Sequence, residues 1–341
     1  MYIFLFAVAP IPRRPFSGEK KFRTLSKDGS VTKPEDLPCW LDAWQDQKHL
    51  GRRRSVLEME RAELFISVIV PAYNEEERLA GMLEEAVNFL ERTYGTSTEA
   101  RDPERNTRRR KLNGVTNGHT STPTLSSSGW EIIIVSDGSA DKTEDVAFTF
   151  ARDHQLSLHP KGHVGPWTPD NHEGVHIPPG CIRVVSLTKN RGKGGAVTHG
   201  MRHVRGQYVI FADADGASKF DDLGKLVSIC QDIEDSQKRG IAVGSRVHLV
   251  GSEAVIKRSK LRNFLMHAFH FILWLLTPPV TATIKDTQCG FKLFSRASLP
   301  YIIPYMHSEG WIFDVEMLML AEFAGIPVAE VQVDWRGRGA S

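Results

Sequence analysis

The 341-residue chain has few cysteines, little net charge and no apolar run long enough to cross a membrane. Its four cysteines stand far apart without a C-x-x-C pair, which argues against a disulfide framework or a cysteine zinc site and fits a reducing compartment. The formal net charge of +2 and the lack of a long basic stripe argue against nucleic acid as a partner. The hydrophobic share of 41% and the charged share of 25% are those of an ordinary globular protein.

The apolar start of the chain, MYIFLFAVAP, is too short to span a bilayer, because its run stops at Pro10 and a span needs ~20 residues. No basic region precedes it, which argues against a cleaved signal peptide. Either a shortened membrane anchor or an error in the gene model would account for this apolar start. Residues 1–63 as a whole are polar, contain prolines and lack a clear period, so we expect this segment to be poorly ordered.

From Leu64 onward the pattern alternates between strands and helices. The run Leu64–Val70 is apolar apart from Ser67, as in a strand that is buried on both faces, and a helix with an apolar face follows it. The same order recurs in WEIIIVSDGSADKTEDVAFTFARDH, and further strands are predicted in CIRVVSLT, in Tyr208–Ala212 and in IAVGSRV. This alternation predicts an α/β fold with a mostly parallel sheet and helices on both faces.

Two polar stretches interrupt this pattern, at about 96–129 and about 159–180, and we expect both to be disordered insertions. The first contains the basic cluster RNTRRRK, which we interpret as part of a solvated loop. The second contains four histidines among prolines, at spacings that fit no metal-ligand geometry.

Polar clusters follow three of the predicted strands: PAYNE, SDGSAD and DADG. Ligands bind outside the carboxyl ends of strands in such sheets. Asp213 and Asp215, at the end of an apolar strand, could hold Mg²⁺ or Mn²⁺, which accept carboxylates together with phosphate oxygens and water. A turn with helix-capping acids is the structural alternative.

The D-x-D-G pattern alone also fits a phosphatase of the haloacid-dehalogenase type, in which the first aspartate is a nucleophile. That motif normally follows the first strand of its fold, whereas at least three predicted strands precede it here. The NRGKGGA turn lacks the spacing of a P-loop, which excludes a P-loop kinase. A lysine among glycines at the start of a helix can still hold a diphosphate.

Six motifs, taken in order, resemble the inverting glycosyltransferases of family 2: SVIVPAYNEEERL, IIIVSDGSADKT, NRGKGGAV, FADADGASKF, GSR and DTQCGFKLF. RGKGGA and DTQCGFKLF are similar in particular to the branch that transfers glucose from UDP-glucose to dolichyl phosphate. The resemblance runs from about Ile66 to Trp335 without the insertions. It implies a GT-A, Rossmann-like fold, Mg²⁺ or Mn²⁺ as cofactor, and UDP-glucose and membrane-borne dolichyl phosphate as substrates.

The resemblance also implies roles for individual residues. Nucleotide-sugar binding falls to Pro71, Ala72, Tyr73, Glu75, Asp137, Lys193 and Asp213, with Asp137 on the uracil and Lys193 at the diphosphate. The metal falls to Asp213 and Asp215, and the acceptor phosphate to Arg246, Arg258 and Arg262. The catalytic acids are Asp286 and Asp314. Because a phosphate monoester, with a second pKa of about 6, is largely ionised at neutral pH, Asp286 need not act as a base and could instead position the acceptor or the metal.

The same resemblance divides the chain into four parts. Residues 1–63 would be a remnant of the membrane anchor, 64–248 the nucleotide-sugar half, 249–335 the acceptor half and 336–341 a truncated tail. The family differs from this chain in its full N-terminal anchor and longer C-terminal tail. It also often has an acid where this chain has Ser136; neighbouring residues of a strand point to opposite faces, so we expect little loss from this change.

The segment Leu261–Leu276 predicts an apolar helix that begins near Arg262 and is too short to span a bilayer. A membrane-proximal amphipathic helix at the interface and a buried core helix both fit this pattern. The resemblance places the protein at the endoplasmic reticulum membrane with its active site facing the cytoplasm. GDP-mannose as donor and a non-catalytic UDP-sugar-binding protein remain the alternatives.

Overall fold

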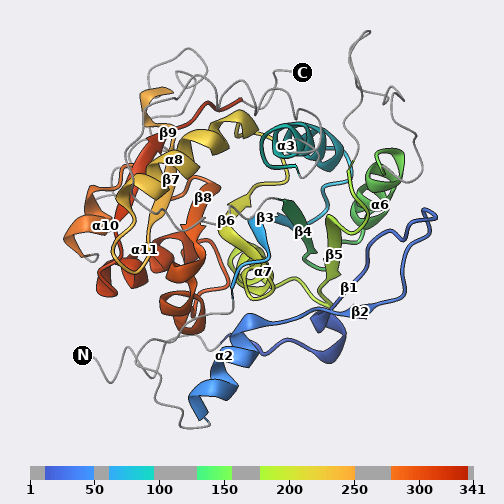
Figure 1. Cartoon of the computed structure of the whole chain (residues 1–341), viewed down its shortest axis with the longest axis horizontal. Helices are drawn as coiled ribbons and strands as arrows, with labels where there is room; N and C mark the ends of the chain where they lie inside the picture. Colours follow the sequence, from blue (N-terminus) through green and yellow to red (C-terminus); the bar gives the residue numbers. More distant parts are fainter. Residues whose placement is uncertain (1–11, 50–60, 96–128, 156–176, 250–277, 337–341) are drawn as a thin grey trace, which may run out of the picture.

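The computed structural model of the chain describes residues 12–49, 61–95, 129–155, 177–249 and 278–336 (Figure 1). The predicted insertions, apart from their ends, and the predicted membrane-proximal helix at 261–276 lie outside these residues. Within the described residues, no helix is both long and apolar enough to cross a membrane.

A seven-stranded sheet forms the centre of the molecule, in the order β5-β4-β3-β6-β8-β7-β9. The four strands β3 to β6 are parallel, β8 runs antiparallel to both of its neighbours, and β7 and β9 are parallel to each other. This arrangement confirms the predicted mostly parallel sheet. The strands are β3 (Leu64–Ala72), β4 (Trp130–Ser136), β5 (Ile182–Ser186), β6 (Gly206–Ala212), β7 (Ile241–Ser245), β8 (Phe291–Ser295) and β9 (Val328–Gln332).

Helices cover both faces of the sheet, as the sequence predicts (Figure 1). Alternate strand residues point to opposite faces, so Val68 and Val70 join one apolar cluster while Ile69, between them, joins the other. The first cluster includes residues of α3 (Leu79–Tyr94), α6 (Thr143–Asp153) and α8 (Leu223–Ile233). The second includes residues of α7 (Gly192–Met201), α11 (Phe313–Phe323) and α2 (Trp40–His49).

The N-terminal part of the chain corrects one prediction, since residues 12–49 are structured where the pattern indicated little order. They contain η1 (Ser17–Lys20), the short strands β1 (Lys21–Phe22) and β2 (Glu35–Asp36), and α2. Trp40 is buried and its Nε1 donates a hydrogen bond to the carbonyl of Met201, 2.7 Å away, in α7. Three of the buried apolar residues, Trp40, Leu41 and Trp44, lie on α2, but the others stand apart in the polar stretch before it, so the segment as a whole has no clear period.

Short elements connect the remaining parts of the sheet. They are η2 (Phe220–Asp222), η3 (Val247–Leu249), α10 (Pro279–Thr283), η4 (Arg296–Tyr301) and η5 (Ile303–Tyr305). Strands β8 and β9 come from the predicted acceptor half, yet they bond into the same sheet as the strands of the predicted nucleotide half.

Candidate active site

The order of the strands places a topological switch point between β3 and β6. From β3 the chain builds the sheet outward through β4 and β5 and then returns to add β6 on the other side of β3. Ligands of open α/β sheets bind at such a switch point, outside the carboxyl ends of the strands. The three polar motifs PAYNE, SDGSAD and DADG follow β3, β4 and β6 there, as the sequence predicts.

The loops after β3 and β4 are bonded to each other. The backbone N–H of Asp137 donates to the carbonyl of Ala72 over 2.8 Å, and the backbone N–H of Glu75 donates to Thr143 Oγ1, also over 2.8 Å. Pro71 is the second-last residue of β3, whereas Tyr73 lies just beyond the strand and is 51% exposed. The predicted nucleotide-binding segment after β3 is therefore joined to the loop after β4 and exposes the aromatic ring of Tyr73.

Glu75 lies close enough to both aspartates of the D-x-D motif to feel their charges. Burial raises the pKa of Glu75 above its ordinary value; Arg78 opposes this, and the carboxylates of Asp215 and Asp213 add to it. The three acids therefore bring negative charge to this end of the sheet, which Arg78 and Lys193 offset in part.

Asp137 is buried and its Oδ1 accepts a hydrogen bond of 2.7 Å from the backbone N–H of Arg191, just before α7. Burial raises the pKa of Asp137, while bonds from the N–H groups of Arg191 and Gly192 oppose the rise. Gly138, with φ of +71°, approaches the next turn so closely that a Cβ would lie 2.8 Å from the nitrogen of Asn190. The SDGS and NRGKGG motifs thus form one packed unit.

Asp213 is held from two sides. Its Oδ1 forms an ion pair of 2.6 Å with Lys193 Nζ, from the first turn of α7, and its backbone N–H donates to the carbonyl of Gly290 over 3.2 Å. A Cβ on Gly290 would lie 2.0 Å from Asp213 Oδ2, so a larger residue there would displace the carboxylate of Asp213. The DTQCGFKLF motif therefore packs directly on the D-x-D motif.

The donor set fits a hard divalent cation that is completed by substrate. Among the described residues, no three or more His, Cys, Asp and Glu side chains form a complete metal site. Asp215 uses one oxygen to accept from the N–H of Ala217, at 3.1 Å, and Gly216 makes the turn between them with φ of +64°. Two carboxylates that leave positions for phosphate oxygens and water match the preference of Mg²⁺, which is seldom enclosed by protein ligands alone.

Asp286 and Arg246 form a bidentate ion pair, with Nε to Oδ2 at 2.7 Å and Nη2 to Oδ1 at 2.8 Å. The backbone N–H of Arg246 adds a third bond to Oδ2, at 3.0 Å. Burial would raise the pKa of Asp286, but the guanidinium holds it below its ordinary value. A carboxylate that is ionised and saturated in this way positions an arginine better than it removes a proton.

Asp314 in α11 is almost fully buried, and its Oδ1 is paired with Nζ of Lys292, which is itself completely buried. Lys292 also donates to the carbonyl of Cys289 over 2.6 Å. Burial raises the pKa of Asp314, and the charges of Lys292 and Lys193 oppose the rise. The carboxylate that the resemblance assigns to catalysis thus has a buried lysine as its immediate partner.

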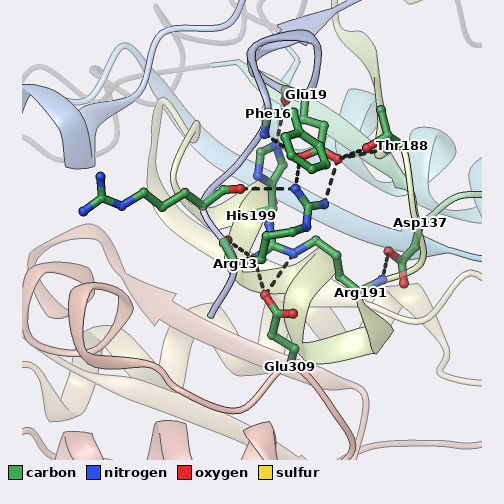
Figure 2. A network of polar contacts seen from close by, with 9 residues as sticks. Arg13, Phe16, Glu19, Asp137, Thr188, Arg191, His199 and Glu309 are labelled. Carbon is green, nitrogen blue, oxygen red and sulfur yellow. Dashed lines mark hydrogen bonds and ion pairs between the residues drawn. The ribbon is translucent and has the colours of Figure 1, made fainter. Parts of the chain in front are cut away.

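Two predicted arginines, Arg258 and Arg262, lie outside the described residues. The motif comparison missed several residues that hold the site together: Arg13, Glu19, Arg191, Gly290, Lys292 and Glu309. Figure 2 shows Arg191 between Asp137 and Glu309, with Arg13 and Glu19 beside it. Gly290 and Lys292 stand inside a recognised motif, which was a usable signal, whereas Arg13 and Glu19 stand in a segment without any pattern.

Comparisons with known proteins follow the same motifs. A family model described as "Glycosyl transferase family 2" matches residues 168–299. Three relatives carry the name dolichyl-phosphate beta-glucosyltransferase. That of Saccharomyces cerevisiae is 36% identical over 98% of this chain and 81% of its own length. Those of Drosophila melanogaster and Homo sapiens are 40% and 37% identical, over 80% and 92% of this chain and 67% and 79% of their own lengths.

Among solved structures, glucosyl-3-phosphoglycerate synthase of Mycobacterium tuberculosis resembles the chain with a TM-score of 0.45 and 16% identity, over 81% of this chain and 73% of that one.

Proposed function

The chain belongs to the dolichyl-phosphate β-glucosyltransferases of glycosyltransferase family 2, and we propose that it takes glucose from UDP-glucose and transfers it with inversion. Membership in this family makes it an enzyme that transfers a glucosyl group to dolichyl phosphate. The proposed product is dolichyl β-D-glucosyl phosphate, formed by direct attack on an α-linked donor from the side opposite the leaving diphosphate.

The observation that carries the proposed donor is the ion pair of Lys193 with Asp213 at the switch point of the sheet. A UDP leaving group accumulates negative charge on its diphosphate as the bond to the sugar breaks, so preorganised positive groups accelerate the reaction. Lys193 lies in the first turn of α7, where the helix dipole also favours an anion. The lysine can exchange its bond to Asp213 for one to the diphosphate.

The residues around Arg246 support the acceptor side of the proposal. The acceptor phosphate is largely ionised at neutral pH, since its second pKa is about 6, and so attacks without a strong general base. The guanidinium of Arg246 is partly exposed and is oriented by Asp286. We assign it to the acceptor phosphate and assign Asp286 to its orientation.

For the cofactor, we propose that Asp213 and Asp215 hold Mg²⁺ or Mn²⁺ together with the donor diphosphate. The cation would neutralise the leaving group as a Lewis acid. The clustered charges of Glu75, Asp213 and Asp215 support this assignment.

We also propose that the protein acts at the endoplasmic reticulum membrane with its site facing the cytoplasm. An acceptor with a polyisoprenoid tail resides in a bilayer, and the four free cysteines fit the reducing side of that membrane.

The test is product formation from radiolabelled UDP-glucose and dolichyl phosphate in detergent, with and without Mn²⁺. GDP-mannose is the control donor, and D215A is the control variant. We expect metal-dependent labelled lipid from UDP-glucose alone, and none with D215A. Labelled lipid from GDP-mannose instead would change the donor. UDP binding without any lipid product would instead indicate a non-catalytic binding protein, and a chain that does not bind UDP would overturn the donor assignment.

A further inference from the structure

We propose that the N-terminal strap, residues 13–20, is a working part of the nucleotide site, in which Arg13 and Glu19 act as positioning residues for Asp137. The strap lies on the α7 side of the sheet, in blue in Figure 1. The inference rests on the proposed function, because it assumes that Asp137 contacts the nucleotide of the donor.

Glu19 fastens the strap to Thr188, which lies in the loop that follows β5. Its carboxylate is fully buried and accepts two bonds from the guanidinium of Arg13, at 2.8 and 2.9 Å. Thr188 donates to it through its backbone N–H at 2.9 Å and its hydroxyl at 2.6 Å, and the N–H of Phe16 donates at 2.9 Å (Figure 2). A buried carboxylate is tolerated only when it is paired and hydrogen-bonded in this way.

Arg191 continues the connection from the strap to Asp137. Its Nη2 donates to the carbonyl of Arg13 over 2.9 Å, and its Nε donates to Glu309 Oε1 over 2.9 Å. Its own backbone N–H donates to Asp137 Oδ1 over 2.7 Å (Figure 2). The side chain is only 6% exposed, so these partners fix its position. One residue thus joins the strap, the loop before α11 and the predicted uracil-binding acid.

The turn between Thr188 and Arg191 is exposed to solvent, but its backbone packs closely at two points. It packs against Gly138, where a Cβ would lie 2.8 Å from the nitrogen of Asn190. At its other end a Cβ on Gly192 would lie 2.7 Å from the carbonyl oxygen of Glu309. Since close packing transmits strain, a strap that is loosened at Glu19 should displace Asp137 through the buried Arg191, although the strap does not contact the nucleotide.

The test compares E19Q with D42N in the full-length protein. E19Q leaves Arg13 without its charged partner, whereas D42N removes the ion partner of Lys20, 2.7 Å away, at a place that does not reach the turn. The dissociation constant of UDP is measured by calorimetry, and KM and kcat for UDP-glucose are measured in the transfer assay. For E19Q we expect UDP affinity to fall and KM to rise by about tenfold, which corresponds to about 1.4 kcal/mol, with kcat little changed. For D42N we expect the wild-type values.

A purely structural role for the strap would lower the melting temperature of E19Q and leave the UDP affinity of the folded protein unchanged, which would overturn the proposal. If E19Q does not fold, the double variant R13M/E19L replaces the ion pair with apolar side chains and should fold with the same loss of UDP affinity. The wild type supplies an independent measurement by hydrogen exchange. UDP should slow exchange in residues 13–20, and unchanged exchange there with UDP bound would refute the connection. If the wild type does not bind UDP, the proposed function fails instead.

Discussion

The buried pair of Lys292 and Asp314 gives the sharpest test of the structure, through the variant D314N. Both side chains are excluded from solvent, at 0% and 3% exposure. Removing the carboxylate charge would leave the ammonium with the carbonyl of Cys289 at 2.6 Å and the ring of Phe211, whose centroid is 5.2 Å away. Neither group replaces a full opposite charge in a buried site.

The expected cost of D314N is roughly 3–5 kcal/mol of unfolding free energy, the usual effect of breaking a buried ion pair on one side. For a domain of this size each kcal/mol lowers the melting temperature by roughly 2–4 °C, which predicts a fall of about 6–20 °C. Replacing both partners with apolar side chains, in K292M/D314L, should restore most of the lost stability because no charge is then buried.

The assay is urea or thermal unfolding of the wild type and the two variants, followed by glucosyl transfer. A D314N protein as stable as the wild type would refute the pairing and leave Asp314 free to face the acceptor. The double variant also separates the two roles of this acid. We expect it to remain active, because the pair is structural in this arrangement, whereas a stable but inactive double variant would support the catalytic contact that the resemblance implies.

Three further predictions concern the same region. In G290A the new Cβ would lie 2.0 Å from Oδ2 of Asp213, so kcat should fall by about 10²-fold, as for a misplaced catalytic group. The control is G81A, whose Cβ would have no atom within 4 Å and which should behave as wild type in the transfer assay. In R246K the bidentate geometry is lost, and KM for dolichyl phosphate should rise more than KM for UDP-glucose; equal changes would argue against the acceptor assignment. Burial would raise the pKa of Glu19, but hydrogen bonds, chiefly from Arg13, lower it to about 2. The stability that the charge of Glu19 contributes is therefore complete above its ordinary pKa of about 4.5 and is lost as the pH falls toward 2. Urea midpoints of wild type and E19Q should therefore differ at neutral pH and converge near pH 2, and a constant difference would contradict the pairing.

The predictable part of the fold is the part whose strands are buried on both faces. Residues of β3 from Ile66 to Val70 are all fully buried, as the run of apolar residues around Ser67 predicts. Strand β8 gives a weaker signal, because its second residue is Lys292, and a charged residue in a strand ordinarily indicates a solvent-exposed face. Only the position of Asp314, on a helix that is distant in the sequence, explains how that lysine can be buried.

The candidate site was predictable motif by motif but not in its contacts. The carboxyl ends of parallel strands meet at one edge, so Asp137 and Asp213 could be placed together from the sequence. The contact of Asp213 with Gly290 depends on the register of an antiparallel pair, which no local pattern specifies. Arg13 and Glu19 were missed for another reason, since a buried ion pair in an aperiodic segment has the composition of a solvated loop.

The register of β6 and β8 explains why one short motif carries three unlike residues. Ala212 pairs with Phe291, which brings the next residue of β6, Asp213, beside Gly290. Before that point Asp286 holds Arg246, and after it Lys292 turns back to hold Asp314. DTQCGFKLF therefore orients a guanidinium, makes room for a carboxylate and neutralises a buried acid within seven positions, from Asp286 to Lys292. An insertion or deletion in this stretch should disturb all three contacts together, whereas a substitution should disturb only the contact of the residue that it replaces. The three contacts therefore depend on one register and form a single structural unit.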